Sequence, residues 1–188
     1  MKKLYLIHGW GGTPASEGWF GWLIKECEKR NIKIEIPEIP NTEEPEINLW
    51  VSKLQEVAQD VDEETYFIGH SVGCQAIMRF LETLPEDKKI AGLGFVAGWF
   101  NLKEETYEED GEEAREIARP WIETPIDFDK VKQKTNNVIA IFSDNDPYVP
   151  LTDKDLFEQR LNAKIFVKQK EDHFNETQEI TELLELFQ

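Results

Sequence analysis

The sequence predicts an α/β fold with a parallel β-sheet, and two observations lead to this prediction. Six short runs rich in Ile, Val, Leu, Phe and Tyr recur along the 188 residues, and segments with helical patterns separate them. Strands that alternate with helices of about 10 to 15 residues indicate βαβ units and a parallel sheet. The length indicates a single domain over residues 1–188, because domains commonly have about 150 residues.

The six expected strands are short, and most of them are apolar at nearly every position. This pattern is typical of strands that are buried on both faces. The strands are expected at 3–8, 33–36, 65–69, 92–97, 138–142 and 164–167.

Five segments repeat apolar residues at spacings of three and four, which places these residues on one face of a helix. Trp19, Trp22 and Trp50 lie on such faces, and we expect them in the core. The helices are expected at 19–30, 49–57, 76–84, 151–161 and 176–187.

Residues 99–129 break this alternation. The segment is long, acidic and only partly helical in pattern. A connection of this length in a compact domain usually has a function or is disordered. We therefore expect an acidic, lid-like segment that covers a site.

The strongest local motif is Gly69-His70-Ser71-Val72-Gly73, which has the form G-x-S-x-G. It follows an expected strand and opens an expected helix, which is the context of a nucleophile elbow. Such an elbow holds the serine on a sharp turn, and small neighbours allow the strand and the helix to approach closely. Ser71 is therefore the expected nucleophile, and the alternative is a chance match in a tight turn.

A serine nucleophile needs a histidine base and a carboxylate that orients the base. The chain has three histidines. The side chain of His70 should diverge from that of Ser71, and His8 belongs to a glycine-rich loop after the first strand. His173, which follows the last strand, remains as the expected base, and the alternative is a lone histidine on the surface.

The acid is expected directly after the fifth strand, in Ser143-Asp144-Asn145-Asp146-Pro147-Tyr148-Val149-Pro150. Asp146 is the expected partner of His173, and Asp144 is the reserve, which could instead cap the next helix. Pro147 and Pro150 stiffen the turn, which suits a carboxylate that must hold an imidazole still. The order Ser, Asp, His along the chain is that of the α/β-hydrolases.

Two backbone N–H groups should stabilise the oxyanion that forms during acyl transfer. One is expected from Val72, the residue after the nucleophile. The other is expected from Trp10, in the loop His8-Gly9-Trp10-Gly11-Gly12-Thr13 after the first strand.

Five motifs, spread in order along nearly the whole chain, resemble those of the small serine hydrolases of the retinoblastoma-binding protein 9 and YdeN group. They are His8-Gly9-Trp10, the elbow, Arg119-Pro120-Trp121, the turn from Asp146 to Pro150, and His173-Phe174. The resemblance implies a minimal α/β-hydrolase with strands in the order 2-1-3-4-5-6 and helices on both faces. It also implies Ser71, Asp146 and His173 as the catalytic triad, and a carboxylesterase-like activity.

Two features depart from the pattern of this group. Its members often have glycine before the catalytic histidine, whereas this chain has Asp172 beside Glu171. Nearby carboxylates favour imidazolium, so we expect the basic limb of activity at higher pH than in a relative with glycine. The Leu-x-Cys-x-Glu motif of the human relative is absent, so no retinoblastoma-type partner is expected.

The composition argues against several other classes of protein. The net charge of −17 disfavours nucleic-acid binding and docking on anionic membranes, because both need clustered Lys and Arg. Neither a nucleotide-binding loop nor zinc-ligand spacing occurs, so no cofactor or metal is expected. Two cysteines form no disulfide framework, and no signal-peptide or membrane-spanning run occurs. We expect a cytoplasmic protein, and its oligomeric state stays open.

Three tryptophans lie in loops expected at the carboxyl edge of the sheet, where α/β folds bind ligands. Trp10, Trp99 and Trp121 are therefore candidate residues of a substrate pocket, and the alternative is packing of the segment 99–129.

The negative charge is concentrated in two segments. Residues 35–64 hold ten acidic residues and one basic residue, and residues 99–129 hold eleven and three. Both segments follow strands expected to flank the catalytic loops, so we expect a negative potential that disfavours anionic substrates. The alternative is that these are solvated faces of acidic helices.

The sequence thus predicts a serine hydrolase that cleaves a small carboxylic ester or a related acyl substrate through an acyl-enzyme. An amidase, peptidase or thioesterase with the same triad is one alternative. A binding protein with this fold and little turnover is the other.

Overall fold

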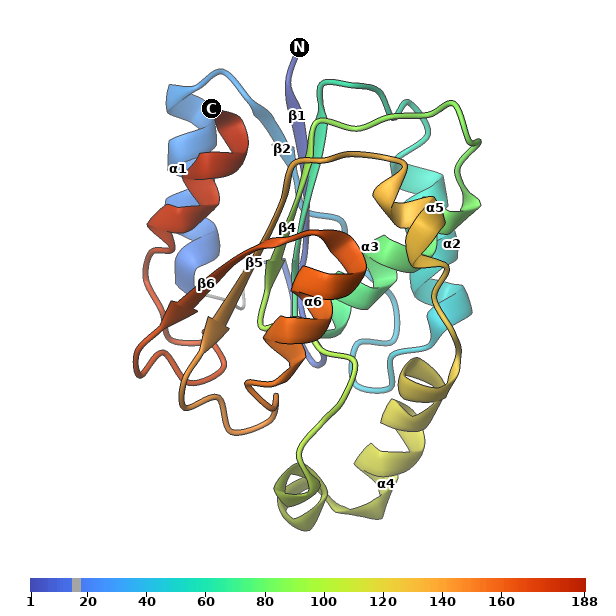
Figure 1. The fold of residues 1–188 in the computed structure, drawn as a ribbon, viewed down its shortest axis with the longest axis vertical. Coiled ribbons are helices and arrows are strands. Elements are labelled where there is room, and N and C mark those ends of the chain that lie inside the picture. Colours follow the sequence, from blue (N-terminus) through green and yellow to red (C-terminus); the bar gives the residue numbers. More distant parts are fainter. Residues whose placement is uncertain (15–17) are drawn as a thin grey trace.

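The computed structural model describes residues 1–14 and 18–188, apart from the side chains of residues 109 and 110. Six strands of this part of the chain form one parallel sheet in the order β2-β1-β3-β4-β5-β6 (Figure 1). They are β1 (Lys3–Ile7), β2 (Lys33–Glu35), β3 (Thr65–His70), β4 (Gly92–Val96), β5 (Val138–Ser143) and β6 (Lys164–Lys168). Each begins at the residue predicted from the sequence and ends within one residue of the predicted end. The α/β class and the strand order are confirmed.

Helices cover both faces of the sheet, as Figure 1 shows. On one face lie α1 (Gly18–Lys29) and the 3-10 helix η1 (Thr181–Phe187). On the other lie α2 (Ile47–Val57), α3 (Val72–Thr83), α5 (Phe128–Lys132) and α6 (Asp153–Leu161). The remaining helix, α4 (Glu104–Glu123), extends beyond the carboxyl ends of the strands. None of the described helices is long and apolar enough to cross a membrane.

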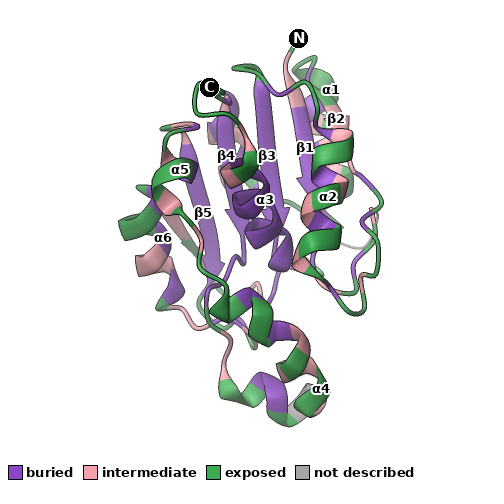
Figure 2. Cartoon of the chain, turned by 90° about the vertical axis from the view of Figure 1, so that its right-hand side faces the viewer, coloured by how far each residue is buried: buried purple, intermediate pink, exposed green. Residues whose placement is uncertain are grey.

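Alternating side chains of the strands divide the core into two layers. Leu4 and Leu6 of β1 pack in the layer that contains α1 and η1, whereas Tyr5 and Ile7 pack in the layer that contains α2 and α3. β3 is buried at every residue, and α3 is buried over most of its length (Figure 2). The turn that joins β3 to α3 is therefore held between two rigid elements at the centre of the molecule.

The segment 99–129 is more helical than the sequence predicts. α4 takes up 20 of its residues as two helical stretches that meet at Gly111, whose φ of 84° and ψ of 178° are not helical. Glycine adopts this φ readily and other residues do not, and Pro120 interrupts the pattern again near the end of the helix. Because Gly111 and Pro120 interrupt the helical pattern, the sequence alone does not predict α4. The sequence also does not predict α5, whose five residues are too few to show a periodic pattern.

The predicted helix over 176–187 is wrong in its extent and its type. Residues 176–180 are not helical, and Thr181–Phe187 forms a 3-10 helix. Leu183 and Leu186 pack against Gly94 of β4, where an added Cβ would lie 2.9 Å from Leu186 and 3.2 Å from Leu183. A spacing of three residues fits both an α-helix and a 3-10 helix, so the pattern alone does not distinguish them.

Candidate active site

Ser71 lies on a sharp turn between β3 and α3. Its backbone has φ 52° and ψ −126°, which non-glycine residues rarely adopt. The turn is tight because three elements converge there. An added Cβ at Gly69 would lie 2.7 Å from the backbone N of Cys74, and one at Gly73 would lie 2.5 Å from the carbonyl oxygen of His8. Close approach therefore explains both glycines of the motif, as the sequence analysis expected.

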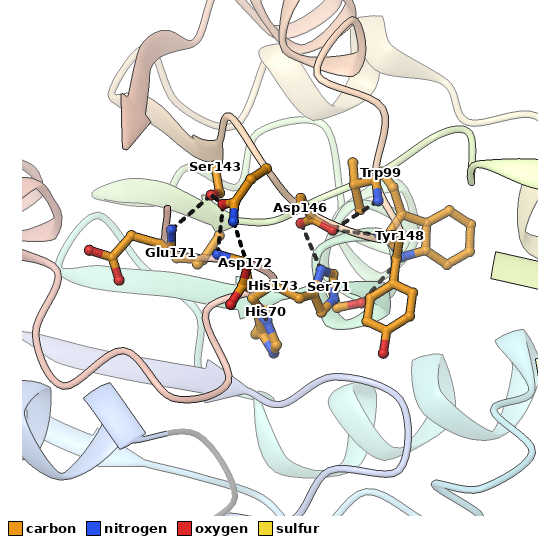
Figure 3. A network of polar contacts seen from close by, with 12 residues as sticks. His70, Ser71, Trp99, Ser143, Asp146, Tyr148, Glu171, Asp172 and His173 are labelled. Carbon is orange, nitrogen blue, oxygen red and sulfur yellow. Dashed lines mark hydrogen bonds and ion pairs between the residues drawn. The ribbon is translucent and has the colours of Figure 1, made fainter. Parts of the chain in front are cut away.

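Asp146 and His173 meet beside this turn (Figure 3). Oδ2 of Asp146 lies 2.8 Å from Nδ1 of His173, and both residues are buried. The other carboxylate oxygen, Oδ1, accepts the backbone N–H groups of Tyr148 at 2.8 Å and Val149 at 2.9 Å. The turn thus fixes the carboxylate. Because Nδ1 donates to it, Nε2 is the basic nitrogen of the neutral imidazole.

Asp144, the reserve acid, has a different role. Its Oδ1 accepts the backbone N–H of Lys170 at 2.8 Å, and the residue is exposed. It ties the loop after β5 to the loop after β6. Of the two carboxylates, Asp146 is the one that meets His173.

Ser71 and His173 line the same cavity, which has a volume of about 540 Å³. The indole Nε1 of Trp99 donates a hydrogen bond of 3.3 Å to Oγ of Ser71, as Figure 3 shows. The ring of Tyr148 packs edge-on against the ring of His173, with 5.1 Å between their centroids. The serine and the histidine therefore share a site with aromatic walls.

The structure adds a contact that sequence reasoning missed. Nε2 of His70 donates to the backbone carbonyl of His173 at 2.8 Å, across 103 positions of the chain. Their rings lie 4.9 Å apart between centroids. No local sequence pattern predicts this hydrogen bond, because it depends on how the loop after β6 folds back onto the turn at Ser71.

The acidic residues before His173 are engaged by other side chains. Nδ2 of Asn145 donates to Asp172 at 2.5 Å, and the hydroxyl of Thr177 donates to Glu171 at 2.7 Å. Asp172 has φ 45°, in the left-handed region that favours glycine. A glycine would therefore fit this position without strain.

The glycine-rich loop after β1 passes directly beside Ser71. An added Cβ at Gly9 would lie 3.1 Å from Cβ of Ser71. Trp10 of this loop is held by its indole N–H, which donates to the carbonyl oxygen of Glu43 at 2.8 Å. Among the hydrogen bonds of residues 1–14 and 18–188, none uses the backbone N–H of Trp10 or of Val72.

The three candidate pocket tryptophans occupy different environments. Trp10 and Trp99 line the cavity at Ser71, whereas Trp121 is not among its lining residues. Trp121 is 2% exposed, its N–H donates to the carbonyl oxygen of Pro45 at 2.8 Å, and its ring packs edge-on against Trp50. Trp121 therefore lies away from the cavity at Ser71, and its contacts fit the alternative of packing within the segment 99–129.

α4 forms the outer wall of the cavity. Its residues in this wall are Thr106, Tyr107, Glu113, Ala114 and Ile117. Lys103, just before α4, anchors the segment, because its backbone N–H donates to the carbonyl of Tyr148 and its ammonium to the carbonyl of Asp146. Burial raises the pKa of the Tyr107 phenol.

The formal charges of the cavity wall are negative. Glu43 and Glu113 line it, and no Lys or Arg of the described residues does. In the same part of the chain, no group of three or more His, Cys, Asp or Glu side chains is placed to hold a metal ion.

The two cysteines are core residues. Both are fully buried, and burial raises the pKa of the Cys27 thiol to about 11. Burial also raises the pKa of Cys74, whose thiol donates to the carbonyl oxygen of Gly69 at 3.2 Å. A thiol held in this protonated form is a poor nucleophile.

Comparison with known proteins finds relatives over almost the whole chain. The YdeN protein of Bacillus subtilis is 27% identical over 182 residues, which cover 97% of this chain and 90% of YdeN. The serine hydrolase RBBP9 of Rattus norvegicus is 28% identical over 169 residues, which cover 89% of this chain and 84% of RBBP9.

Solved structures show the same fold. The crystal structure of YdeN matches with a TM-score of 0.85 at 25% identity and covers 100% of this chain and 97% of that one. A carboxylesterase of the thaumarchaeon Nitrososphaera gargenis matches with a TM-score of 0.72 at 14% identity, covering 99% and 88%. The sequence model of the family described as serine hydrolase matches residues 4–187. The chain therefore belongs to the serine hydrolase family.

Proposed function

We propose that the protein hydrolyses small carboxylic esters, or closely related acyl substrates, through an acyl-enzyme on Ser71. The hydrogen bond between Asp146 and His173, beside a serine on a strained turn, carries this proposal. A buried carboxylate that orients an imidazole next to a serine is the arrangement that activates a hydroxyl. Carboxylesterases among the structures with this fold support the choice of an ester.

In the proposed acylation step, Oγ of Ser71 attacks the acyl carbon while Nε2 of His173 accepts its proton. Asp146 stabilises the imidazolium that forms. The backbone N–H groups of Trp10 and Val72 bind the oxyanion. The ester C–O bond then breaks, and His173 gives its proton to the leaving alcohol.

In the proposed deacylation step, water takes the place of the alcohol. His173 accepts a proton from the water as its oxygen attacks the acyl carbon. The bond between that carbon and Oγ of Ser71 breaks, and the proton passes to Oγ. The acid leaves and the free serine is restored.

The cavity and α4 support a small-molecule substrate. A volume of about 540 Å³ lies within the range of small-molecule sites. We propose that α4 acts as the lid-like segment expected from the sequence, because it closes the cavity from outside the sheet. A cytoplasmic location is part of the same proposal, and the two free, buried cysteines support it.

The test compares wild type, Ser71→Ala and a matched control, Ser52→Ala, on short p-nitrophenyl esters. Ser52 is exposed on α2. Ser71→Ala should lose at least about 10³-fold in kcat, because loss of a triad residue removes the covalent route. Ser52→Ala should keep wild-type activity. Persistent hydrolysis by Ser71→Ala would contradict the proposal. Faster turnover of matched amides or thioesters than of esters would show that amides or thioesters are the preferred substrate class.

A further inference from the structure

We propose that the indole N–H of Trp99 is a catalytic hydrogen-bond donor to the nucleophile oxygen of Ser71. This inference rests on the proposed function, because it concerns the same reaction. It assigns Trp99 more than a place in the pocket wall. The backbone N–H groups of Trp10 and Val72 donate to the carbonyl oxygen of the substrate, whereas the indole N–H of Trp99 donates to Oγ of Ser71.

The geometry fixes the direction of this hydrogen bond. Nε1 of Trp99 lies 3.3 Å from Oγ of Ser71. An indole N–H can only donate, so Oγ accepts, and the hydroxyl proton of Ser71 remains for another acceptor. His173 lines the same cavity, and Nε2 is its basic nitrogen because Nδ1 donates to Asp146. Trp99 therefore favours the hydroxyl orientation in which the proton can pass to His173.

Two braces hold the backbone that carries this indole. Nε2 of Gln75, on α3, donates to the carbonyl oxygen of Trp99 at 3.0 Å. Oδ2 of Asp153, at the start of α6, accepts the backbone N–H groups of Phe100 at 2.6 Å and Asn101 at 2.9 Å. Gln75 and Asp153 are almost completely buried. The loop after β4 is thus held by side chains from α3 and α6, directly beside the site.

The brace on α3 continues to the end of α4. Oε1 of Gln75 accepts from Nη2 of Arg79 at 3.1 Å. The same Nη2 donates to the carbonyl oxygens of Trp121 at 3.0 Å and Thr124 at 2.8 Å. Arg79 is 5% exposed, and burial lowers its pKa. This chain of hydrogen bonds connects the end of the outer wall with the residue that contacts Ser71.

The charge changes of the reaction give Trp99 its role. As Oγ attacks and its proton moves to His173, electron density builds on Oγ until the bond to the acyl carbon is complete. In deacylation the same bond breaks, and Oγ carries the electron pair until His173 returns the proton. A donor 3.3 Å away in the resting site strengthens when negative charge appears, because hydrogen bonds to charged acceptors are shorter and stronger. Trp99 therefore lowers the barrier of both steps.

The experiment replaces Trp99 by Phe, which keeps an aromatic ring and removes the N–H. We expect kcat for a p-nitrophenyl ester, and the rate of inactivation by a fluorophosphonate, to fall about 10-fold or more, with KM within about twofold of wild type. Trp50→Phe is the matched control, because Trp50 is equally buried and does not line the cavity. It should lose thermal stability and keep both rates.

Several outcomes would overturn the inference. An unchanged kcat with a raised KM in Trp99→Phe would show that Trp99 only shapes the pocket. Equal losses of kcat in Trp99→Phe and Trp50→Phe would show that the effect comes from altered packing. If Trp99→Phe does not fold, benzothienylalanine at position 99 keeps the shape and replaces the N–H by sulfur, and wild-type rates in that protein would refute the role. Wild-type protein that neither reacts with the fluorophosphonate nor cleaves the ester would overturn the proposed function itself.

Discussion

Nε2 of His70 donates a hydrogen bond of 2.8 Å to the backbone carbonyl of His173. His70 precedes Ser71 in the chain, so this bond joins the segment of Ser71 to the segment of His173. Since the acceptor is a carbonyl, Nε2 of His70 carries a proton. His70 is 2% exposed and packs edge-on against Trp19. These contacts make it a brace between Ser71 and His173.

Replacing His70 by Phe should therefore lower kcat about 10-fold and leave KM within about twofold, because small errors in the position of a catalytic group slow the chemical step. His70→Gln keeps a side-chain N–H donor and should recover part of the loss. The measurement is steady-state kinetics with a thermal melt of each variant. Wild-type kcat in His70→Phe would show that the bond does not position His173.

Asp146→Asn should lower kcat by about 10³- to 10⁴-fold, because an amide no longer holds the imidazole in the required tautomer. Asp144→Asn is the matched control. Its amide oxygen can still accept the N–H of Lys170, so kcat should stay within about twofold of wild type. A large loss in Asp144→Asn and a small one in Asp146→Asn would exchange the two roles.

The residues of the site differ in how far the sequence reveals them. Ser71 lies in a motif whose glycines have a local reason, and Asp146 and His173 follow strands that the apolar pattern locates to within one residue. The structure brings these three together. The hydrogen bonds from Trp99 to Ser71 and from His70 to His173 join loops that are distant in the chain. The apolar periodicity of a single helix or strand gives no information about such bonds.

Asp172→Asn should move the pH at which half of the maximal kcat/KM is reached. His173 must be neutral to accept the proton of Ser71, so a carboxylate that favours imidazolium acts on the acidic limb of the profile. This corrects the expectation from the sequence, which assigned the shift to the basic limb. Removing the charge should shift the acidic limb to lower pH by about 0.3 to 0.5 pH units, because the exposed carboxylate is screened. Asp172→Glu keeps the charge and should keep the profile. An unmoved limb in both Asp172→Asn and Asp172→Gly would exclude this influence.

The cavity should prefer cationic esters over anionic ones. Glu43 and Glu113 line it, whereas no described Lys or Arg does. For two p-nitrophenyl esters of equal length, one ending in trimethylammonium and one in sulfonate, kcat/KM at low salt should differ about 10-fold in favour of the cation. The difference should shrink at high salt and in Glu43→Gln/Glu113→Gln. Glu86→Gln, an exposed acid away from the cavity, should leave it unchanged. Equal kcat/KM for the two esters at low salt would contradict the prediction.

Some features of α4 cannot be read from one sequence. Trp121 lies in a segment beyond the carboxyl edge of the sheet, which predicts a place at the pocket, but its indole donates to the carbonyl oxygen of Pro45 and packs on Trp50 in the core. Gly111 separates the two helical stretches of α4, and Pro120 interrupts the pattern of the second stretch although that stretch continues past it. The direction of a side chain and the type of a helix depend on the residues that pack against them. A single sequence does not show which residues these are.

Ser71 is proposed as the nucleophile that forms the acyl-enzyme. The most direct measurement is intact-protein and peptide mass spectrometry after treatment with a fluorophosphonate. We predict one adduct per chain, located on Ser71, which is absent in Ser71→Ala and present in Ser52→Ala. An unmodified wild-type protein, or an adduct on another residue that persists in Ser71→Ala, would contradict the claim.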